Sequence, residues 1–191
     1  MHDHKFDENK FQKLNDPKRL ELQPPALLWQ HWGLPGVTVI GDIGAGTGFF
    51  AKAFLGLAPA ARVVALDVSD FMLSWMAEHL PEVAAGKIIP TKMQESSTPL
   101  ADQSLDLACM LNLHHELHSP QDLLQDCLRI LKPGGRLLIS DWLPLPMDMG
   151  PPLAIRLAPE LIATQMQEAG FAPVQVHPGL ACHCLVVGQK P

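Results

Sequence analysis

The chain has 191 residues, of which 47% are apolar and 18% charged, and its net charge is 14 − 20 = −6. This size and balance predict one globular domain with enough buried surface to fold without a metal or a disulfide. An acidic chain is a poor partner for a phosphate backbone, so we expect no nucleic acid among its substrates. No run of 18 apolar residues occurs, which predicts that no segment spans a membrane.

The cysteines and the N-terminus indicate a compartment. Four cysteines are too few and too unevenly spaced for a disulfide scaffold, so reduced thiols are expected. The first residues are polar and lack the apolar core of a secretory signal. Both observations favour a cytoplasmic protein.

After a polar, highly charged stretch over residues 1–24, Pro25 is suited to open a helix over 26–32 that Gly33 ends. From residue 37 onward, the apolar pattern alternates between strand and helix. Strands are expected at 37–43, 62–67, 87–91, 105–111, 136–140, 172–177 and 182–187. Helices are expected at 49–57, 70–79, 120–131 and 160–169, with Ser69 and Ser119 as N-caps.

Strands separated by helices of about ten residues imply right-handed crossovers and parallel pairing. Pro178-Gly179 separates the last two strands, which can therefore pair as a hairpin. The predicted fold class is α/β: a Rossmann-like, seven-stranded, mostly parallel sheet with helices on both faces and one antiparallel strand in the C-terminal hairpin.

A glycine-rich turn joins the first strand to the next helix. Gly44, Gly46 and Gly48 are spaced G-x-G-x-G, and Phe49 follows. A dinucleotide site uses G-x-G-x-x-G, with a third glycine where this chain carries the bulky Phe49. The spacing therefore disfavours a nicotinamide dehydrogenase, although the glycines could also form nothing more than a tight strand–helix turn.

Two carboxylates accompany this turn. Asp42 stands two residues before Gly44, a poor place beside a phosphate but a good one beside an ammonium group. Asp67 ends the second strand, where an acidic side chain can accept from both hydroxyls of a ribose. The alternative for Asp67 is a helix cap, for which Ser69 is better placed. A cofactor with a ribose, an amino-acid end and no phosphate fits, and S-adenosylmethionine, with S-adenosylhomocysteine as its product, is such a cofactor.

Together these segments resemble the class I S-adenosylmethionine-dependent methyltransferases, in particular the type 11 group related to the ubiquinone/menaquinone methyltransferases. The resemblance covers nearly all of residues 37–190 and includes the VVALDVS segment at 63–69 and LKPGGR at 131–136. It implies methyl transfer to a small-molecule acceptor by in-line displacement. The alternative is a non-catalytic protein or complex subunit that binds the same cofactor.

The resemblance also implies a set of cofactor contacts. Met72 would pack on the adenine, although by itself it is plain core; Met110 and Leu111 would offer backbone carbonyls to the ammonium. Gln94 stands where the family usually has an acidic residue, so the contact to the adenine amino group lies with Gln94 or Glu95. The expected cofactor-binding residues are Asp42, Gly44, Ala45, Gly46, Gly48, Asp67, Val68, Met72, Gln94, Glu95, Met110 and Leu111.

Residues 112–118 follow the fourth strand at the carboxyl edge, where ligands bind in such sheets. His115 and Glu116 are the candidates for catalysis, facing the acceptor; a base is needed only if the nucleophile starts protonated. The open alternative is a loop held together by histidine hydrogen bonds.

Metal binding is a weaker interpretation of the histidines and cysteines. His114 and His118 would share a helical face, and Cys182 and Cys184 one face of a strand, but neither pair belongs to a four-ligand zinc spacing. No metal site is predicted. Arsenic methyltransferases use thiols, but Cys109 and Cys127 lie in apolar runs that are typical of core.

The resemblance further implies two walls around the acceptor. Residues 1–33 are expected to form a helical arm or lid over the cofactor site of a domain at 34–191, with His2, His4 and Phe6 lining the acceptor pocket. A solvated tail is the alternative. The proline-rich connection 142–159 would form the other wall, where Arg156 could pair with an anionic acceptor.

Overall fold

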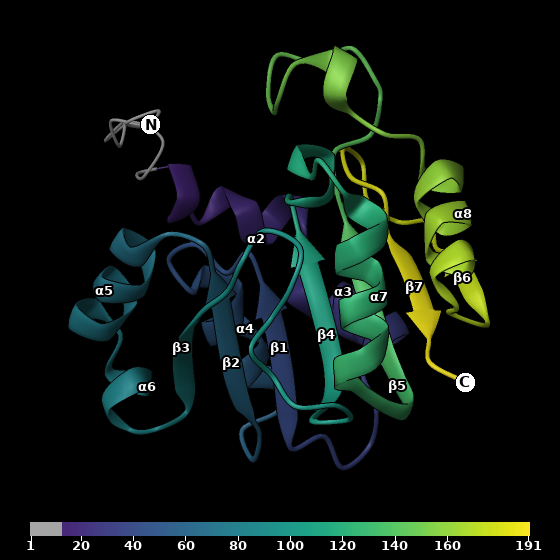
Figure 1. Ribbon diagram of the computed structural model, residues 1–191. Coiled ribbons are helices and arrows are strands. Elements are labelled where there is room, and N and C mark those ends of the chain that lie inside the picture. Colours follow the sequence, from purple (N-terminus) through teal and green to yellow (C-terminus); the bar gives the residue numbers. More distant parts are fainter. Residues whose placement is uncertain (1–12) are drawn as a thin grey trace.

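A seven-stranded sheet forms the centre of the computed structural model, which describes residues 13–191 (Figure 1). Strands β1 to β5 run parallel, and β7 runs antiparallel to both β5 and β6. This confirms the predicted α/β class and its single antiparallel strand. In spatial order the strands are β3 (Ile88–Lys92), β2 (Arg62–Asp67), β1 (Val39–Ile43), β4 (Leu105–Leu111), β5 (Leu131–Ser140), β7 (Val186–Gln189) and β6 (Val174–Val176).

Helices cover both faces of the sheet, because the strands carry apolar side chains on both faces. Val64 and Leu66 face a core formed with α7 and α8, whereas Val63 and Ala65 face a second core formed with α3, α4 and α5. The helices are α2 (Lys18–Leu22), α3 (Pro25–Trp32), α4 (Phe49–Leu57), α5 (Asp70–His79), α6 (Pro81–Ala84), α7 (Pro120–Ile130) and α8 (Pro159–Ala169), with 3-10 turns η1 (His114–Glu116) and η2 (Leu153–Ile155). Within residues 13–191, none of these helices is both long and apolar enough to cross a membrane.

Strand β5 begins earlier than the sequence predicts. The expected helix over 120–131 ends at Ile130, and Leu131 already pairs with Leu105 of β4. The register then shifts, and pairing resumes between Arg136 and Leu107. The predicted start of this strand at residue 136 was wrong, because pairing with β4 already begins at Leu131, before the irregularity. Ser119 occupies the N-cap of α7, but its side chain makes no capping bond there.

The C-terminal hairpin has shorter pairing than predicted. β6 covers Val174–Val176 and β7 covers Val186–Gln189, instead of 172–177 and 182–187. Residues 182–185 lie instead beside the continuation of β5, where Leu143 N–H donates to Cys182 O and Cys184 N–H donates to Asp141 O. This shift places residues 182–185 beside the carboxyl end of β5.

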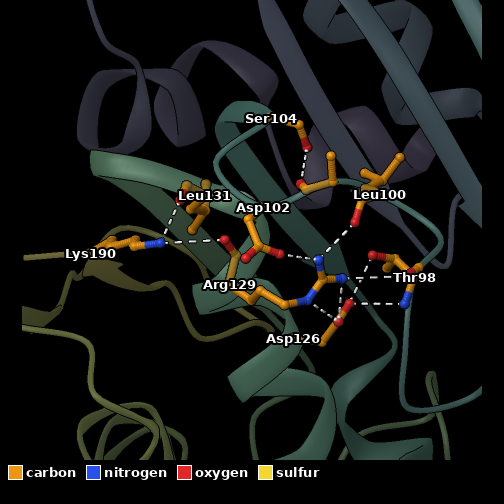
Figure 2. A network of polar contacts seen from close by, with 9 residues as sticks. Thr98, Leu100, Asp102, Ser104, Asp126, Arg129, Leu131 and Lys190 are labelled. Atoms are coloured by element: carbon orange, nitrogen blue, oxygen red, sulfur yellow. Dashed lines mark hydrogen bonds and ion pairs between the residues drawn. The ribbon is translucent and has the colours of Figure 1, made fainter.

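A network of hydrogen bonds and ion pairs around Arg129 holds the long connection from β3 to β4 in place (Figure 2). The guanidinium donates to Asp126 Oδ1 (2.7 Å), Asp102 Oδ1 (2.7 Å) and the carbonyl of Leu100 (2.8 Å). Asp126 Oδ2 accepts from both the backbone and the hydroxyl of Thr98 at 2.8 Å. Charge-assisted bonds of this kind fix the connection at the end of α7. The residues that precede Thr98 follow directly from the end of β3, at the opposite, carboxyl edge of the sheet.

Candidate functional site

The glycine turn is folded by backbone geometry that only glycine adopts without strain. Gly44, Gly46 and Gly48 have φ of +72°, +56° and +73°, in the left-handed region. The N–H groups of Gly44 and Ala45 both donate to Leu66 O, at 2.8 and 2.9 Å. These bonds hold the turn against the carboxyl end of β2.

One face of the turn stays open to a ligand. A Cβ on Gly44 would lie 2.8 Å from Leu113 Cδ2, so this glycine is required by packing. Among the described residues, 13–191, a Cβ on Gly46 would meet only the tip of Leu14, at 3.8 Å. The turn therefore packs on one side and leaves the backbone of Gly46 approachable on the other.

Asp67 ties the turn to the end of β2. Its Oδ2 accepts from Gly46 N–H (2.7 Å) and its Oδ1 from Ser69 N–H (2.8 Å). A carboxylate has about four lone-pair positions, so two remain for other donors. Ser69 Oγ accepts from Met72 N–H at the start of α5, which confirms Ser69 as the N-cap. The capping alternative for Asp67 is thus only part of what this carboxylate does.

Asp42 is a buried carboxylate with a free oxygen. Its Oδ1 accepts from the Cys109 thiol (3.5 Å), and its Oδ2 has no hydrogen-bond partner among the described residues. Burial raises the pKa of Asp42 to about 6, against the lowering effects of the Cys109 bond and the Arg19 charge. A buried acceptor without a partner is costly, and an ammonium group would satisfy it.

The remaining predicted cofactor residues gather at the same edge. Met93 N–H donates to Asp67 O (3.1 Å), so Gln94 and Glu95 leave β3 directly beside the end of β2. Met72 is buried in α5, Val68 is exposed after β2, and Met110 and Leu111 end β4. The structure therefore brings the predicted set together along the carboxyl ends of β3, β2, β1 and β4.

Helix α2 lies across this edge, at the top of the sheet in Figure 1. The Arg19 guanidinium lies 4.9 Å from the ring centroid of Phe50 and 5.4 Å from that of Phe49. Burial lowers the pKa of Arg19, while the nearby charge of Asp42 raises it. A cation and an anion thus face the same space above the glycine turn. His2, His4 and Phe6, expected to line an acceptor pocket, lie outside the described residues.

Gln23, just after α2, fastens this segment to the sheet. Its Nε2 donates to Ser140 Oγ at the end of β5 (2.7 Å), and its Oε1 accepts from Asn112 Nδ2 (2.9 Å). Gln23 is only 1% exposed, so these are buried, specific bonds. The following helix α3 packs into the sheet core through Leu28 and Trp32. Within the described part of the predicted arm, the residues that contact the site are therefore Arg19 and Gln23, before α3.

His115 is held by a buried carboxylate. Its Nδ1 lies 2.7 Å from Asp141 Oδ1, and its backbone N–H donates to Asp141 Oδ2 (3.0 Å). A carboxylate only accepts, so Nδ1 carries the proton and Nε2 is left as the basic nitrogen. Burial alone would lower the pKa of His115, but the Asp141 bond and charge and the Glu116 charge together raise it.

Glu116 lies differently from His115. Its side chain is 68% exposed, and Oε1 is 3.7 Å from His115 Nε2. That distance allows an electrostatic contact but exceeds an ordinary hydrogen bond. The two candidates are therefore only loosely paired: His115 is buried and held by Asp141, and Glu116 faces solvent.

The Arg156 guanidinium is hydrogen-bonded to backbone carbonyls of its own loop. Its Nε, Nη1 and Nη2 donate to the carbonyls of Pro151, Leu145 and Met149, at 2.8, 2.8 and 2.7 Å. The expectation that Arg156 pairs with an anionic acceptor is not supported by this arrangement. The guanidinium instead gathers the proline-rich connection into a lobe, seen above the sheet in Figure 1.

The histidines of the 112–118 segment point to separate partners. His114 is buried, with Nε2 2.8 Å from Gln165 Oε1, while His118 Nδ1 lies 2.6 Å from Glu95 Oε1 at the surface. Within residues 13–191 no three His, Cys, Asp or Glu side chains converge as a metal site. Burial raises the pKa of the Cys109, Cys127 and Cys184 thiols, that of Cys184 to about 12. These thiols therefore stay protonated and are poor metal ligands and nucleophiles.

Two site residues escaped the sequence analysis: Gln23 and Asp141. Asp141 directly follows β5, and placement at the carboxyl edge was the one signal that could have identified it. Gln23 contacts Ser140, 117 positions away, and nothing local indicates this.

The match to known proteins agrees with this geometry. Residues 41–139 match the methyltransferase domain family. An arsenite methyltransferase from Halobacterium salinarum is 31% identical over 160 residues, covering 75% of this chain and 39% of the relative. The ubiquinone/menaquinone biosynthesis C-methyltransferase UbiE from Ectopseudomonas mendocina is 32% identical over 124 residues, covering 60% and 48%. The chain thus spans less than half the length of these curated relatives.

A solved structure is similar over the whole chain. The S-adenosylmethionine-dependent methyltransferase from Aquifex aeolicus superposes with a TM-score of 0.88 at 28% identity. The alignment covers 98% of this chain and 100% of that chain. The similarity therefore includes the glycine turn, the carboxyl edge and the C-terminal hairpin alike.

Proposed function

Because the chain belongs to the methyltransferase domain family, and to its class I S-adenosylmethionine-dependent members, we propose that it transfers a methyl group from S-adenosylmethionine to a small-molecule acceptor by in-line displacement. The observation that carries this proposal is the arrangement around the glycine turn. Asp67 fixes the turn through Gly46, whose face is open, and Asp42 presents a buried oxygen without a partner. These features fit a ligand with a ribose and an ammonium group.

Different residues of the site would bind different parts of the cofactor. Asp42 Oδ2 would accept from the ammonium, and the two free lone-pair positions of Asp67 from the ribose hydroxyls. Arg19, beside Asp42, would pair with the carboxylate of the same amino-acid end. Met72 would pack on the adenine, with Gln94 or Glu95 at its amino group. When bound, this cofactor supplies an electrophilic methyl group on a positively charged sulfur.

The chemistry left to the chain is alignment and removal of a proton. Asp141 holds the His115 ring with Nδ1 protonated, which leaves Nε2 to accept a proton from an acceptor that starts protonated. This is the orienting role of a carboxylate behind a histidine base. Glu116, near Nε2, would stabilise the imidazolium that forms. Both residues thus serve the acceptor rather than the cofactor.

The segment from α2 to Gln23 would cover the bound cofactor. Arg19 reaches the glycine turn and Gln23 anchors the segment at β5, so one short stretch spans both halves of the site. Excluding water there would strengthen the electrostatic contacts of Asp42 and Asp67. The proposal keeps a cytoplasmic location, supported by four cysteines that remain thiols.

Calorimetry followed by product labelling tests the proposal. S-adenosylhomocysteine should bind, and NAD should give no heat of binding. The chain should then be incubated with methyl-labelled S-adenosylmethionine and a metabolite extract, and a labelled small molecule should form. Binding without any labelled product would favour a non-catalytic cofactor-binding protein, and NAD binding without S-adenosylhomocysteine binding would contradict the proposal altogether.

A further inference from the structure

His183 is a buried histidine whose two ring nitrogens make no hydrogen bond within residues 13–191. The residue is 2% exposed, and neither Nδ1 nor Nε2 has a hydrogen-bond partner among the described residues. It lies in the segment that runs beside the end of β5, where it forms a backbone bridge with Trp142. Buried polar groups are nearly always paired, so two unpaired nitrogens on one ring indicate a missing ligand group.

The surroundings of His183 place it beside the proposed catalytic residues. Its ring centroid lies 4.1 Å from that of Trp142, which directly follows Asp141. The charges that act on His183 are those of Asp141, just after β5, Arg19 in α2 and Arg156 in the lobe. Charged groups from the cofactor side and from the lobe are therefore both near enough to act on this ring.

A cavity opens on the lobe side. Its volume is about 740 Å³ and it is lined by residues 145–153 together with Arg156. Arg156 lies 5.9 Å from the Trp142 ring centroid, and that ring in turn contacts His183. Asp148 and Arg156 are the charged side chains of this lining, and the Arg156 donors are used by carbonyls. Seven of the ten lining residues are Leu, Met or Pro, so their side chains can contact a molecule with an apolar body.

The charge state of His183 limits what it can bind. Burial lowers the pKa of His183 to about 4, and the charges of Arg19 and Arg156 act in the same direction. The ring is therefore neutral near pH 7, with one nitrogen that donates and one that accepts. Because the site is buried, the partner that best satisfies both nitrogens is an uncharged group that can donate one hydrogen bond and accept another.

We propose that His183 is an acceptor-binding residue that takes an uncharged group able both to donate and to accept a hydrogen bond, such as a hydroxyl, on a molecule with an apolar body. This inference rests on the proposed function, since it places the group beside the His115–Asp141 pair. His183 selects and orients the acceptor, and His115 handles the proton.

Asn112 supplies an independent observation at the same edge. Its Oδ1 is buried and has no partner among the described residues, and its φ of +58° is rare for a residue other than glycine. Ser140 links the two residues: its carbonyl accepts from Asn112 N–H, and its hydroxyl donates to Cys184 O, next to His183. A buried oxygen without a partner is a feature of ligand sites, so Asn112 Oδ1 offers a second acceptor atom for the same molecule.

The test uses the full chain saturated with S-adenosylhomocysteine and four probes: phenol, toluene, benzoate and benzylamine. Phenol and toluene share an apolar ring and differ by the hydroxyl; the other two carry opposite charges. Binding is followed by NMR of labelled histidine ring nitrogens. His183→Phe keeps a buried ring without its nitrogens, and His183→Gln is the second variant. His177→Phe, at a partly buried histidine stacked on His31, is the matched control.

Phenol should bind saturably and shift the His183 nitrogens, with affinity about tenfold above that of toluene and of both charged probes. His183→Phe should lose about tenfold in phenol affinity, and His177→Phe should lose nothing. Equal phenol binding to wild type and His183→Phe, or preference for benzoate, overturns the inference. If phenol fails to bind while S-adenosylhomocysteine does, the inference alone is overturned; if S-adenosylhomocysteine itself fails to bind, the proposed function falls with it.

Discussion

Asp141 and His115 are joined twice, because one carboxylate oxygen accepts from the ring Nδ1 at 2.7 Å and the other from the backbone N–H at 3.0 Å. Both side chains are buried, at 3% and 5% exposure. A single carboxylate at the end of β5 thus sets the ring tautomer and the course of the turn after β4. The link couples neighbouring strand ends that would otherwise be independent loops.

Asp141→Asn should lower the pKa of His115, since the ring loses its charged partner. A raised pKa in the folded state means that the pair adds stability below the ordinary histidine pKa of about 6.5, and that this stability is lost as pH rises through the raised value. The destabilisation caused by Asp141→Asn should therefore be larger at pH 6 than at pH 9. Histidine NMR titrations and urea unfolding at both values measure this; an unshifted His115 pKa would refute the coupling.

His115→Ala and Glu116→Gln should leave affinity for S-adenosylhomocysteine nearly unchanged, because both residues lie on the acceptor side. Turnover of the acceptor found by labelling should fall by roughly 10²–10⁴-fold for a true base. Glu116→Gln should lose less than His115→Ala, since Glu116 is exposed and 3.7 Å away. Weak cofactor binding and early melting in both variants would instead show a structural brace for the turn.

Asp67→Ala should weaken S-adenosylhomocysteine binding by about 1–3 kcal/mol, because the ribose hydroxyls lose a charged acceptor and Gly46 loses its anchor. Asp70→Ala is the control, since that side chain is 85% exposed and pairs with Lys92 at the surface. Calorimetry of both variants measures the difference. An unchanged affinity for Asp67→Ala would mean that Asp67 serves only the backbone of the turn and of α5.

The sequence was sufficient for the parallel part of the fold, because each strand is an apolar run between helices. It was not sufficient for the C-terminal strands. Residues 182–185 are apolar enough to pair either within the hairpin or beside the continuation of β5, and backbone hydrogen bonds place them beside β5. The Leu131 pairing before Pro133 was missed for a similar reason, as one isolated ladder contact leaves no periodic signal.

The site divides in the same way. Asp42, the glycines and Asp67 are predictable because strand ends and a turn place them within one local unit. Asp141 and Gln23 act through contacts 26 and 117 positions apart, which no local pattern reveals. The orientation of His183 depends on which way one extended segment faces, so its unpaired nitrogens emerge only from the packed structure.

Gly46→Ala separates backbone strain from ligand contact. The left-handed φ of +56° should cost about 1–2 kcal/mol of stability for alanine. Gly36→Ala is the matched control, with φ of +71° and no atom within 4 Å of the added Cβ. Both variants should lose similar stability, but only Gly46→Ala should also lose about tenfold in S-adenosylhomocysteine affinity, because its Cβ projects onto the open face of the turn. Equal affinities in the two variants would place the cofactor elsewhere.

Acid should act on stability through two buried groups with opposite effects. The pKa of His183 is lowered to about 4, so between pH 6.5 and 4 this residue binds a proton in the unfolded chain but not in the folded one. The stability of the fold therefore decreases as the pH falls through this range. The pKa of Asp42 is raised to about 6, so between pH 6 and 4 the folded chain binds the extra proton, and stability rises as pH falls. His183→Phe removes the first effect: its stability relative to wild type should increase by about 2–3 kcal/mol between pH 7 and pH 4.5. Asp42→Asn removes the second, so its stability relative to wild type should decrease over the same interval. Urea unfolding of wild type and of both variants at pH 7 and pH 4.5 measures the changes. If the stabilities of all three proteins changed equally between these pH values, burial would not disfavour the charged form of either group.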